Sequence, residues 1–305
     1  MTEIHHPWTA ADQAAMAAFR AKLAAHPIAL TRTSFDRIVE QSAPLVDGVD
    51  YSEARVGGIP GVWCTPASRQ EGVAMLYLHG GGYFLGTARA FRGFVCRLAA
   101  RSGVAAFIAD YRLAPEHPFP AAYDDARAAH RDLSQQLGAE RVAIVGDSAG
   151  GGLALSLLQE EPSAACGVLL APWSDLALTG NSLDTKAADD PVLTRSVLED
   201  GVRKYLGAQD PRDRRASPLY GRTRGTPPIQ VHVGTAEILL DDALRLGSSE
   251  KTEVHVWEGM PHSFPRSVAL FEAARAAQEI IAAFLRANLV PTTDVRSMPI
   301  TEISS

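Results

Sequence analysis

The sequence predicts an α/β fold in which helices cover both faces of a mostly parallel sheet. Short apolar runs alternate along the chain with segments of helical periodicity, which indicates consecutive βαβ units. Runs such as GVAMLYLHG, at 72–80, are apolar at almost every position, as strands buried on both faces are. With 305 residues, 46% of them hydrophobic and 21% charged, the chain is long enough to enclose such a core.

The elements are justified in order from residue 50. The segment at 50–66 predicts two strands joined by a turn at Gly57 and Gly58, and 72–80 a third strand. Phe91, Val95 and Leu98 recur at helical spacing in 91–101. Further strands are expected at 104–113, 141–146, 166–173, 228–234 and 253–259, and further helices at 121–138 and 153–160. The expected sheet therefore has eight strands.

Three segments lie outside this alternation. Residues 1–45 are alanine-rich and are predicted to be helical, and residues 177–215 insert a polar loop and a helix between two strands. An insert of this kind often lies over the carboxyl edge of the sheet, where ligands bind in open α/β folds. We therefore expect a helical cap from both segments, a catalytic domain over 46–290 and a loose polar tail over 291–305.

Composition favours a small-molecule partner. The net charge of −6 carries no basic patch, which argues against binding to nucleic acid or to an acidic membrane. The first residues lack a signal-peptide pattern and no apolar run approaches 18 residues, so a cytoplasmic location is expected. Cys64, Cys96 and Cys166 lie far apart in apolar runs without metal-ligand spacing, which indicates buried thiols and no metal site.

The run RVAIVGDSAGG, at 141–151, ends a predicted strand in a glycine-flanked serine. The pattern Gly146-x-Ser148-x-Gly150 is typical of a tight strand-to-helix turn that exposes a nucleophilic hydroxyl. The following helix N-terminus favours negative charge, including the oxyanion of an acyl-transfer intermediate. A second glycine run, HGGGY at 79–83, also follows a strand and leaves backbone amides free to bind such an oxyanion.

A serine nucleophile needs a base to remove its proton, and that base needs a third group to orient it. His262 is the favoured base because it lies in a loop directly after the last expected strand. The other eight histidines lie in N-terminal or helical surface contexts, inside strands, in the glycine run or in a proline-rich segment: His5, His6, His26, His130, His232, His255, His79 and His117.

The acid is expected after the strand at 228–234. Glu237 comes three residues past Gly234, close to the end of that strand. Asp241 and Asp242 come one helical turn later, where carboxylates usually serve as caps or first-turn charges. Glu237 is therefore the predicted acid, with Asp241 as the alternative, since the chain order serine, acid, histidine suits all three.

Five motifs together resemble the hormone-sensitive-lipase branch of the α/β-hydrolases, the bacterial esterase group with an HGGG loop. They are HGGGY, DYRLAPEHPFPAAYDD, GDSAGG, APWSDL and EGMPHSF, in the order of that family and over residues 50–290. The resemblance implies a serine carboxylesterase that needs no cofactor, with Ser148 as nucleophile, His262 as base and the amides of Gly81, Gly82 and Ala149 as oxyanion hole. There are two departures: EIL replaces the DPL acid motif, and the segment RLGSSEKTE before the histidine is short.

The resemblance implies a pocket under the cap for short- to medium-chain esters. Apolar side chains that could line this pocket, or equally form the core of the cap, are Trp8, Phe19, Tyr83, Phe84, Leu198, Val202 and Tyr205. Lactone hydrolysis is an alternative, because relatives that cleave cyclic esters, including terpene lactones, carry a similar DDPVLTRSVLED segment. Amide hydrolysis and a homodimer remain open. A non-catalytic receptor is disfavoured by the joint presence of Ser148 and His262. Activity is expected to fall between pH 8 and 5, as His262 is protonated.

Overall fold

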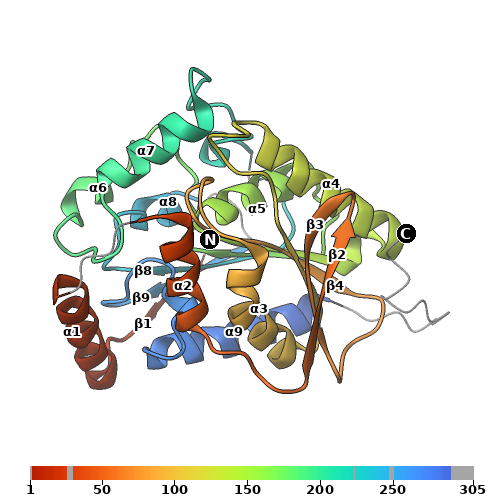
Figure 1. Ribbon diagram of the computed structural model, residues 1–305, viewed down its shortest axis with the longest axis horizontal. Coiled ribbons are helices and arrows are strands. Elements are labelled where there is room, and N and C mark those ends of the chain that lie inside the picture. Colours follow the sequence, from red (N-terminus) through yellow and green to blue (C-terminus); the bar gives the residue numbers. More distant parts are fainter. Residues whose placement is uncertain (1, 26–29, 223, 247–250, 290–305) are drawn as a thin grey trace.

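The computed structural model describes residues 2–25, 30–222, 224–246 and 251–289. Within these residues one nine-stranded sheet has the order β1-β9-β8-β7-β6-β4-β5-β3-β2 (Figure 1). Its strands are β1 (Thr2–His6), β2 (Val49–Val56), β3 (Ile59–Pro66), β4 (Ala74–Leu78), β5 (Ala105–Ala109), β6 (Val142–Asp147), β7 (Cys166–Leu170), β8 (Ile229–Gly234) and β9 (Thr252–Trp257).

The sheet is mostly parallel, as predicted. Only β3 runs antiparallel to its neighbours, β2 and β5. In the parallel part Leu78 of β4 pairs with Gly146 of β6, which in turn pairs with Leu169 of β7. This register ends neighbouring strands at one edge, so the loops that follow β4 and β6 start side by side.

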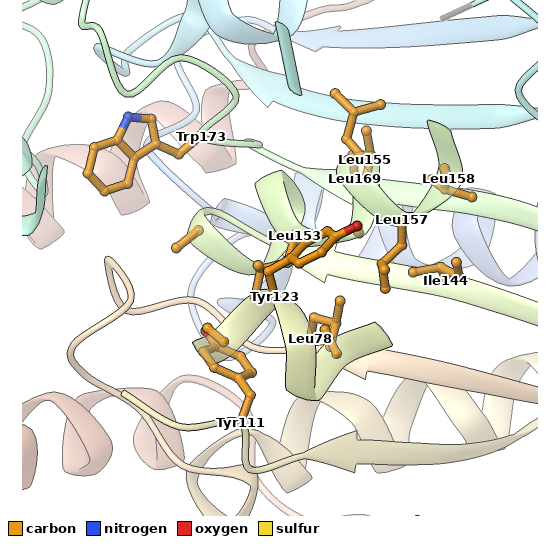
Figure 2. Close-up of a cluster of buried hydrophobic side chains, with 14 of the residues drawn as sticks. Leu78, Tyr111, Tyr123, Ile144, Leu153, Leu155, Leu157, Leu158, Leu169 and Trp173 are labelled. Atoms are coloured by element: carbon orange, nitrogen blue, oxygen red, sulfur yellow. The ribbon is translucent and has the colours of Figure 1, made fainter. Parts of the chain in front are cut away.

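Helices cover both faces of the sheet, which confirms the predicted fold class (Figure 1). Helices α4 (Ala121–Leu137) and α5 (Ala149–Glu160) pack on one face, and α3 (Ala88–Ser102) and α9 (Glu272–Asn288) on the other. Figure 2 shows the first of these cores, where leucines of α5 meet side chains of β4, β6 and β7. Cys64, Cys96 and Cys166 are buried free thiols.

The N-terminal segment differs from the expected all-helical cap. Helices α1 (Ala10–Ala25) and α2 (Arg32–Ser42) form, but residues 2–6 pair with β9 as a ninth strand. The edge of β9 would otherwise present unpaired backbone groups, which favours the addition of a strand. The ring of His6 stacks on Trp257 with 3.7 Å between centroids, so a side chain of β1 also packs against a side chain of β9.

The insert between β7 and β8 contains α6 (Ser182–Thr185) and α7 (Arg195–Leu206), which lie above α5 and α8 (Leu240–Leu244) in Figure 1. Helix α7 begins after Thr194, whose hydroxyl accepts a hydrogen bond from the Val197 amide. Short 3₁₀ turns complete the chain: Ala139–Arg141, Pro218–Tyr220 and Phe264–Arg266. The tail expected over 291–305 lies outside the described residues. No helix in the described part of the chain is long and apolar enough to cross a membrane.

Candidate active site

Ser148 forms the turn between β6 and α5. Its backbone has φ 54° and ψ −116°, a strained positive-φ conformation that non-glycine residues rarely adopt. The Ser148 amide donates to the Leu170 carbonyl at 2.8 Å, which ties the turn to β7. A side chain on Gly150 would overlap the Leu78 carbonyl of β4, so the second glycine of the motif is required by close backbone packing.

The structure brings the three predicted side chains into one chain of hydrogen bonds. His262 Nε2 lies 2.9 Å from Ser148 Oγ, and His262 Nδ1 lies 2.8 Å from Glu237 Oε2. The other oxygen of Glu237 accepts from the Gly234 amide at 2.8 Å. All three side chains are buried. The Glu237 carboxylate therefore orients the imidazole, whose other nitrogen faces the hydroxyl.

Burial shifts the ionisation of this pair in opposite directions. It lowers the pKa of His262, because the imidazolium form loses hydration. It raises the pKa of Glu237, because the charged carboxylate form also loses hydration. Asp190 and Asp147 act against the first shift, because nearby negative charge raises the pKa of His262. A neutral His262, able to accept a proton at Nε2, is the form favoured near pH 7.

Asp241 does not reach His262. Its carboxylate instead accepts from the Ser182 amide at 3.0 Å, and its own amide donates to the Ser182 hydroxyl. Asp242 is also used elsewhere, since its Oδ2 accepts from the amides of Ser174 and Asp175. Helix α8, which holds both aspartates, has only five residues, as the short RLGSSEKTE segment suggested. Residues 247–250 of that segment lie outside the described residues.

The glycine loop lies beside the serine turn. Gly81 and Gly82 have φ of 126° and 61°, a region open to glycine. Within the described residues neither amide donates a hydrogen bond, and both glycines are partly exposed. A hydrogen bond fixes the start of this loop, because Tyr111 Oη donates to the His79 carbonyl at 2.6 Å. Ala149 is the first residue of α5, so its amide points out of the helix N-terminus.

The predicted pocket residues fall into two groups. Tyr83 and Tyr205 stack with 3.9 Å between centroids and are almost fully buried, so each packs mainly against protein. Leu198 is buried and Val202 partly buried in the same cluster, and Lys204 Nζ lies 4.1 Å from the centre of the buried Phe84 ring. A methyl on Gly201 of α7 would come 3.3 Å from the Gly82 carbonyl, so α7 lies directly over the glycine loop.

Two further candidates lie away from this cluster. Trp8 is 42% exposed and its ring lies against Gly259. Phe19 of α1 packs edge-on against Phe271, with centroids 6.2 Å apart, on the α9 side of the sheet. The sequence left open whether these two side chains line the pocket or form the core of the cap, because their neighbours in space were unknown.

The structure adds site residues that the sequence reasoning did not single out. Asp147, Ser263 and Arg266 meet beside Ser148 and His262. Asp190 of the insert accepts from the Ile238 amide at 2.9 Å, directly beside Glu237. Adjacency in sequence to Ser148 and His262 was the available signal for Asp147 and Ser263. No three His, Cys, Asp or Glu side chains of the described residues are grouped so that they could hold a metal ion.

Comparison with known proteins agrees with this geometry. Residues 75–266 match the family model described as the alpha/beta hydrolase fold. An acetyl-hydrolase of Streptomyces hygroscopicus is 38% identical over 267 residues, which cover 84% of this chain and 88% of the relative. An esterase of Acinetobacter venetianus is 36% identical over 222 residues, 69% of this chain and 73% of the relative.

Solved structures point to one branch of this family. An esterase from the bacterial hormone-sensitive lipase family has a TM-score of 0.85 at 34% identity, covering 93% of this chain and 100% of that structure. A hormone-sensitive lipase from a metagenome library has a TM-score of 0.86 at 30% identity, covering 92% and 98%. The fold and the serine turn define an α/β hydrolase. The chain belongs to this family and, within it, to the bacterial hormone-sensitive-lipase group, as the motifs predicted.

Proposed function

We propose that the protein is a serine carboxylesterase that hydrolyses small esters through an acyl-enzyme. The observation that carries the proposal is the hydrogen-bonded series Ser148, His262 and Glu237, with successive distances of 2.9 and 2.8 Å. The named relatives, an acetyl-hydrolase, an esterase and an ethyl acetate hydrolase of Pseudomonas putida, belong to the same enzyme class. Carboxylic ester hydrolysis is thus the activity that sequence, site and relatives support together.

In the proposed reaction His262 Nε2 removes the proton of Ser148 as Oγ bonds to the ester carbonyl carbon. The carbonyl oxygen becomes an oxyanion, and the amides of Gly81, Gly82 and Ala149 would donate to it. When the tetrahedral intermediate collapses, the bond to the alcohol breaks and His262 returns the proton to the leaving oxygen. Water then attacks the acyl-enzyme by the same steps and releases the acid.

Glu237 is proposed to act on His262 and not on the substrate. Its carboxylate accepts the Nδ1 hydrogen, which leaves Nε2 unprotonated toward Ser148. When His262 becomes positively charged, the buried carboxylate stabilises that charge in a site of low dielectric. The Gly234 amide fixes the second carboxylate oxygen, so the pair is oriented before substrate binds.

We further propose that α2, α6 and α7 form the cap, with α1 joining it to the catalytic domain. Arg32 of α2 donates to the Phe84 carbonyl at 3.0 Å, beside the glycine loop. Arg20 of α1 donates to the Asp189 carbonyl of the insert. Gly201 of α7 lies close to the Gly82 carbonyl, which places the insert against the glycine loop, and we propose that this cap limits the pocket to short- to medium-chain acyl groups.

Hydrolysis of p-nitrophenyl butyrate by wild type and Ser148→Ala tests the nucleophile. The alanine variant is expected to lose at least about 10⁴-fold in kcat, because the oxyanion donors alone leave only a small residual rate. Equal rates in the two proteins would overturn the proposal. A lactone and an anilide measured beside the ester define the substrate class, and binding of the ester without turnover in wild type would point to a receptor.

Glu237→Gln and Asp241→Asn form a matched pair for the acid. The first removes the charge that faces His262, and kcat is expected to fall about 10²- to 10⁴-fold. The second changes a carboxylate that contacts Ser182 instead, so kcat is expected to stay within about threefold of wild type. The reverse order of effects would assign the acid to Asp241.

A further inference from the structure

We infer that Asp147, Ser263 and Arg266 form a positioning cluster that holds the histidine loop in register with the serine turn and the glycine loop. The inference rests on the proposed function, because it concerns how Ser148 and His262 are kept in place. None of the three side chains belongs to the hydrogen-bonded series described above.

Asp147 is the centre of the cluster. It is the last residue of β6, directly before Ser148, and its side chain is fully buried. Its Oδ1 accepts a hydrogen bond from the hydroxyl of Ser263, the residue after His262. Its Oδ2 lies 3.1 Å from Nε of Arg266, whose side chain is only 14% exposed. A buried carboxylate of β6 is therefore paired twice with the histidine loop.

The same carboxylate also contacts the glycine loop. A methyl on Gly80 would lie 2.6 Å from Asp147 Oδ2, so no side chain fits between that oxygen and the loop backbone. One side chain thus touches all three segments that supply the proposed reacting groups. A displacement of about 1 Å in such a site can reduce rates about 10²-fold, which is the scale on which this contact matters.

Backbone geometry indicates that the histidine loop needs this support. Ser263 has φ 54°, a left-handed conformation that costs energy for a non-glycine residue. The Ser263 hydroxyl and the Arg266 guanidinium hold the turn by its two ends, and the guanidinium packs over the Phe91 ring at 5.4 Å. Without Asp147, the Ser263 hydroxyl and the Arg266 guanidinium would both lose the carboxylate that they contact.

The charges of the cluster act on His262 in opposite senses. Asp147 raises the pKa of His262 and Arg266 lowers it. The imidazolium of His262 forms only during the proposed reaction. Asp147 stabilises this charged form, and Arg266 keeps His262 neutral in the resting protein. Removal of Arg266 alone should therefore shift His262 toward its charged form, which a merely structural residue would not do.

The test compares Arg266→Gln with Arg266→Lys, Ser263→Ala and Arg245→Gln. Arg245 is the matched control, because it also lies 3.1 Å from a fully buried aspartate, Asp175, in a contact outside the three loops. We would measure kcat and KM for p-nitrophenyl butyrate, the pH profile, and the NMR titration of the His262 imidazole. Ser263→Ala retains both charges and guards against a folding failure of the arginine variants.

For Arg266→Gln we expect kcat to fall about 10- to 100-fold with KM within about threefold, and the acid limb and the His262 titration to move to higher pH. Arg266→Lys should keep the wild-type titration, and Ser263→Ala should lower kcat without moving it. Arg245→Gln should change neither. A wild-type kcat and titration in Arg266→Gln, or equal changes in Arg245→Gln, would overturn the inference.

These outcomes are separable from failure of the proposed function. If wild type and Ser148→Ala were equally inactive, the esterase proposal would fail while the His262 titration would still decide the cluster. A shift of that titration in Arg266→Gln and not in Arg245→Gln would support it, and an unchanged titration would refute it.

Discussion

At the scale of single residues, the burial of His262 sets the pH range in which it can act as a base. From an ordinary histidine pKa of about 6.5, activity was expected to fall between pH 8 and 5. Burial lowers the pKa of His262, so the loss should begin at lower pH. We predict that kcat/KM is level from pH 8 to about 6.5 and falls only below it, as initial rates across buffers would show. A half-maximal rate at or above pH 6.5 would contradict this.

The sequence predicted Ser148 and His262 with fewer alternatives than the acid, for a physical reason. Both lie in short glycine- or proline-bounded loops whose position follows from the preceding strand. Glu237, Asp241 and Asp242 all follow one strand, and the turn between them decides which one faces His262. Here the Gly234 amide binds Glu237 while Ser182 binds Asp241, a choice made by contacts with the insert. Spacing along the chain favoured Glu237 but could not exclude Asp241, because these contacts join segments far apart in the sequence.

At the scale of elements, the insert is anchored to the acid loop by one buried side chain. Asp190 accepts from the amides of Val192 and Leu193, at 2.8 and 2.9 Å, and from Ile238 across the site. Asp190→Ala should therefore reduce the free energy of unfolding by about 2–3 kcal/mol, because three amides lose their acceptor. The neighbour Asp189 is exposed, so Asp189→Ala should change the free energy of unfolding by less than about 0.5 kcal/mol. Urea unfolding of both variants measures the difference, and equal losses would refute the anchor.

Elements with strong periodicity were predicted well, and the exceptions depend on contacts with segments far away in the sequence. The eight expected strands and the hairpin turn at Gly57 and Gly58 are all present. Strand β1 was missed because TEIHH is short and polar, and it is a strand only where β9 offers its edge. Residues 110–113, expected to continue β5, lie outside it: the strand ends at Ala109, and the Asp110 carboxylate accepts a hydrogen bond from the Ala88 amide at the start of α3.

At the scale of the whole molecule, the site depends on contacts between segments far apart in the chain. Ser148 and His262 are 114 residues apart and Asp147 and Ser263 are 116, yet each pair is hydrogen-bonded. The parallel register predicts that the loops meet at one sheet edge, but side-chain pairing across that edge depends on details of packing. For this reason motifs were enough to propose the reacting groups, whereas the supporting cluster could be proposed only from the structure.

Buried histidines should make the whole fold sensitive to acid. His130, expected on a helix surface, is fully buried, its Nδ1 has no partner in the described residues, and burial lowers its pKa to about 4. The unfolded chain binds this proton near pH 6.5 and the folded chain only near 4, so the stabilisation is present above pH 6.5 and is lost as pH falls toward 4.

The resulting loss from His130 is about 3 kcal/mol between pH 7 and 4. His130→Leu, which fills the site without a titrating group, should lose less stability by about that amount when urea unfolding at pH 7 is compared with pH 4. His117→Gln, at an exposed histidine, serves as the control and should follow the wild type. If His130→Leu lost as much stability as the wild type over this range, the acid sensitivity would have to arise from other buried groups, such as His232, whose pKa burial also lowers.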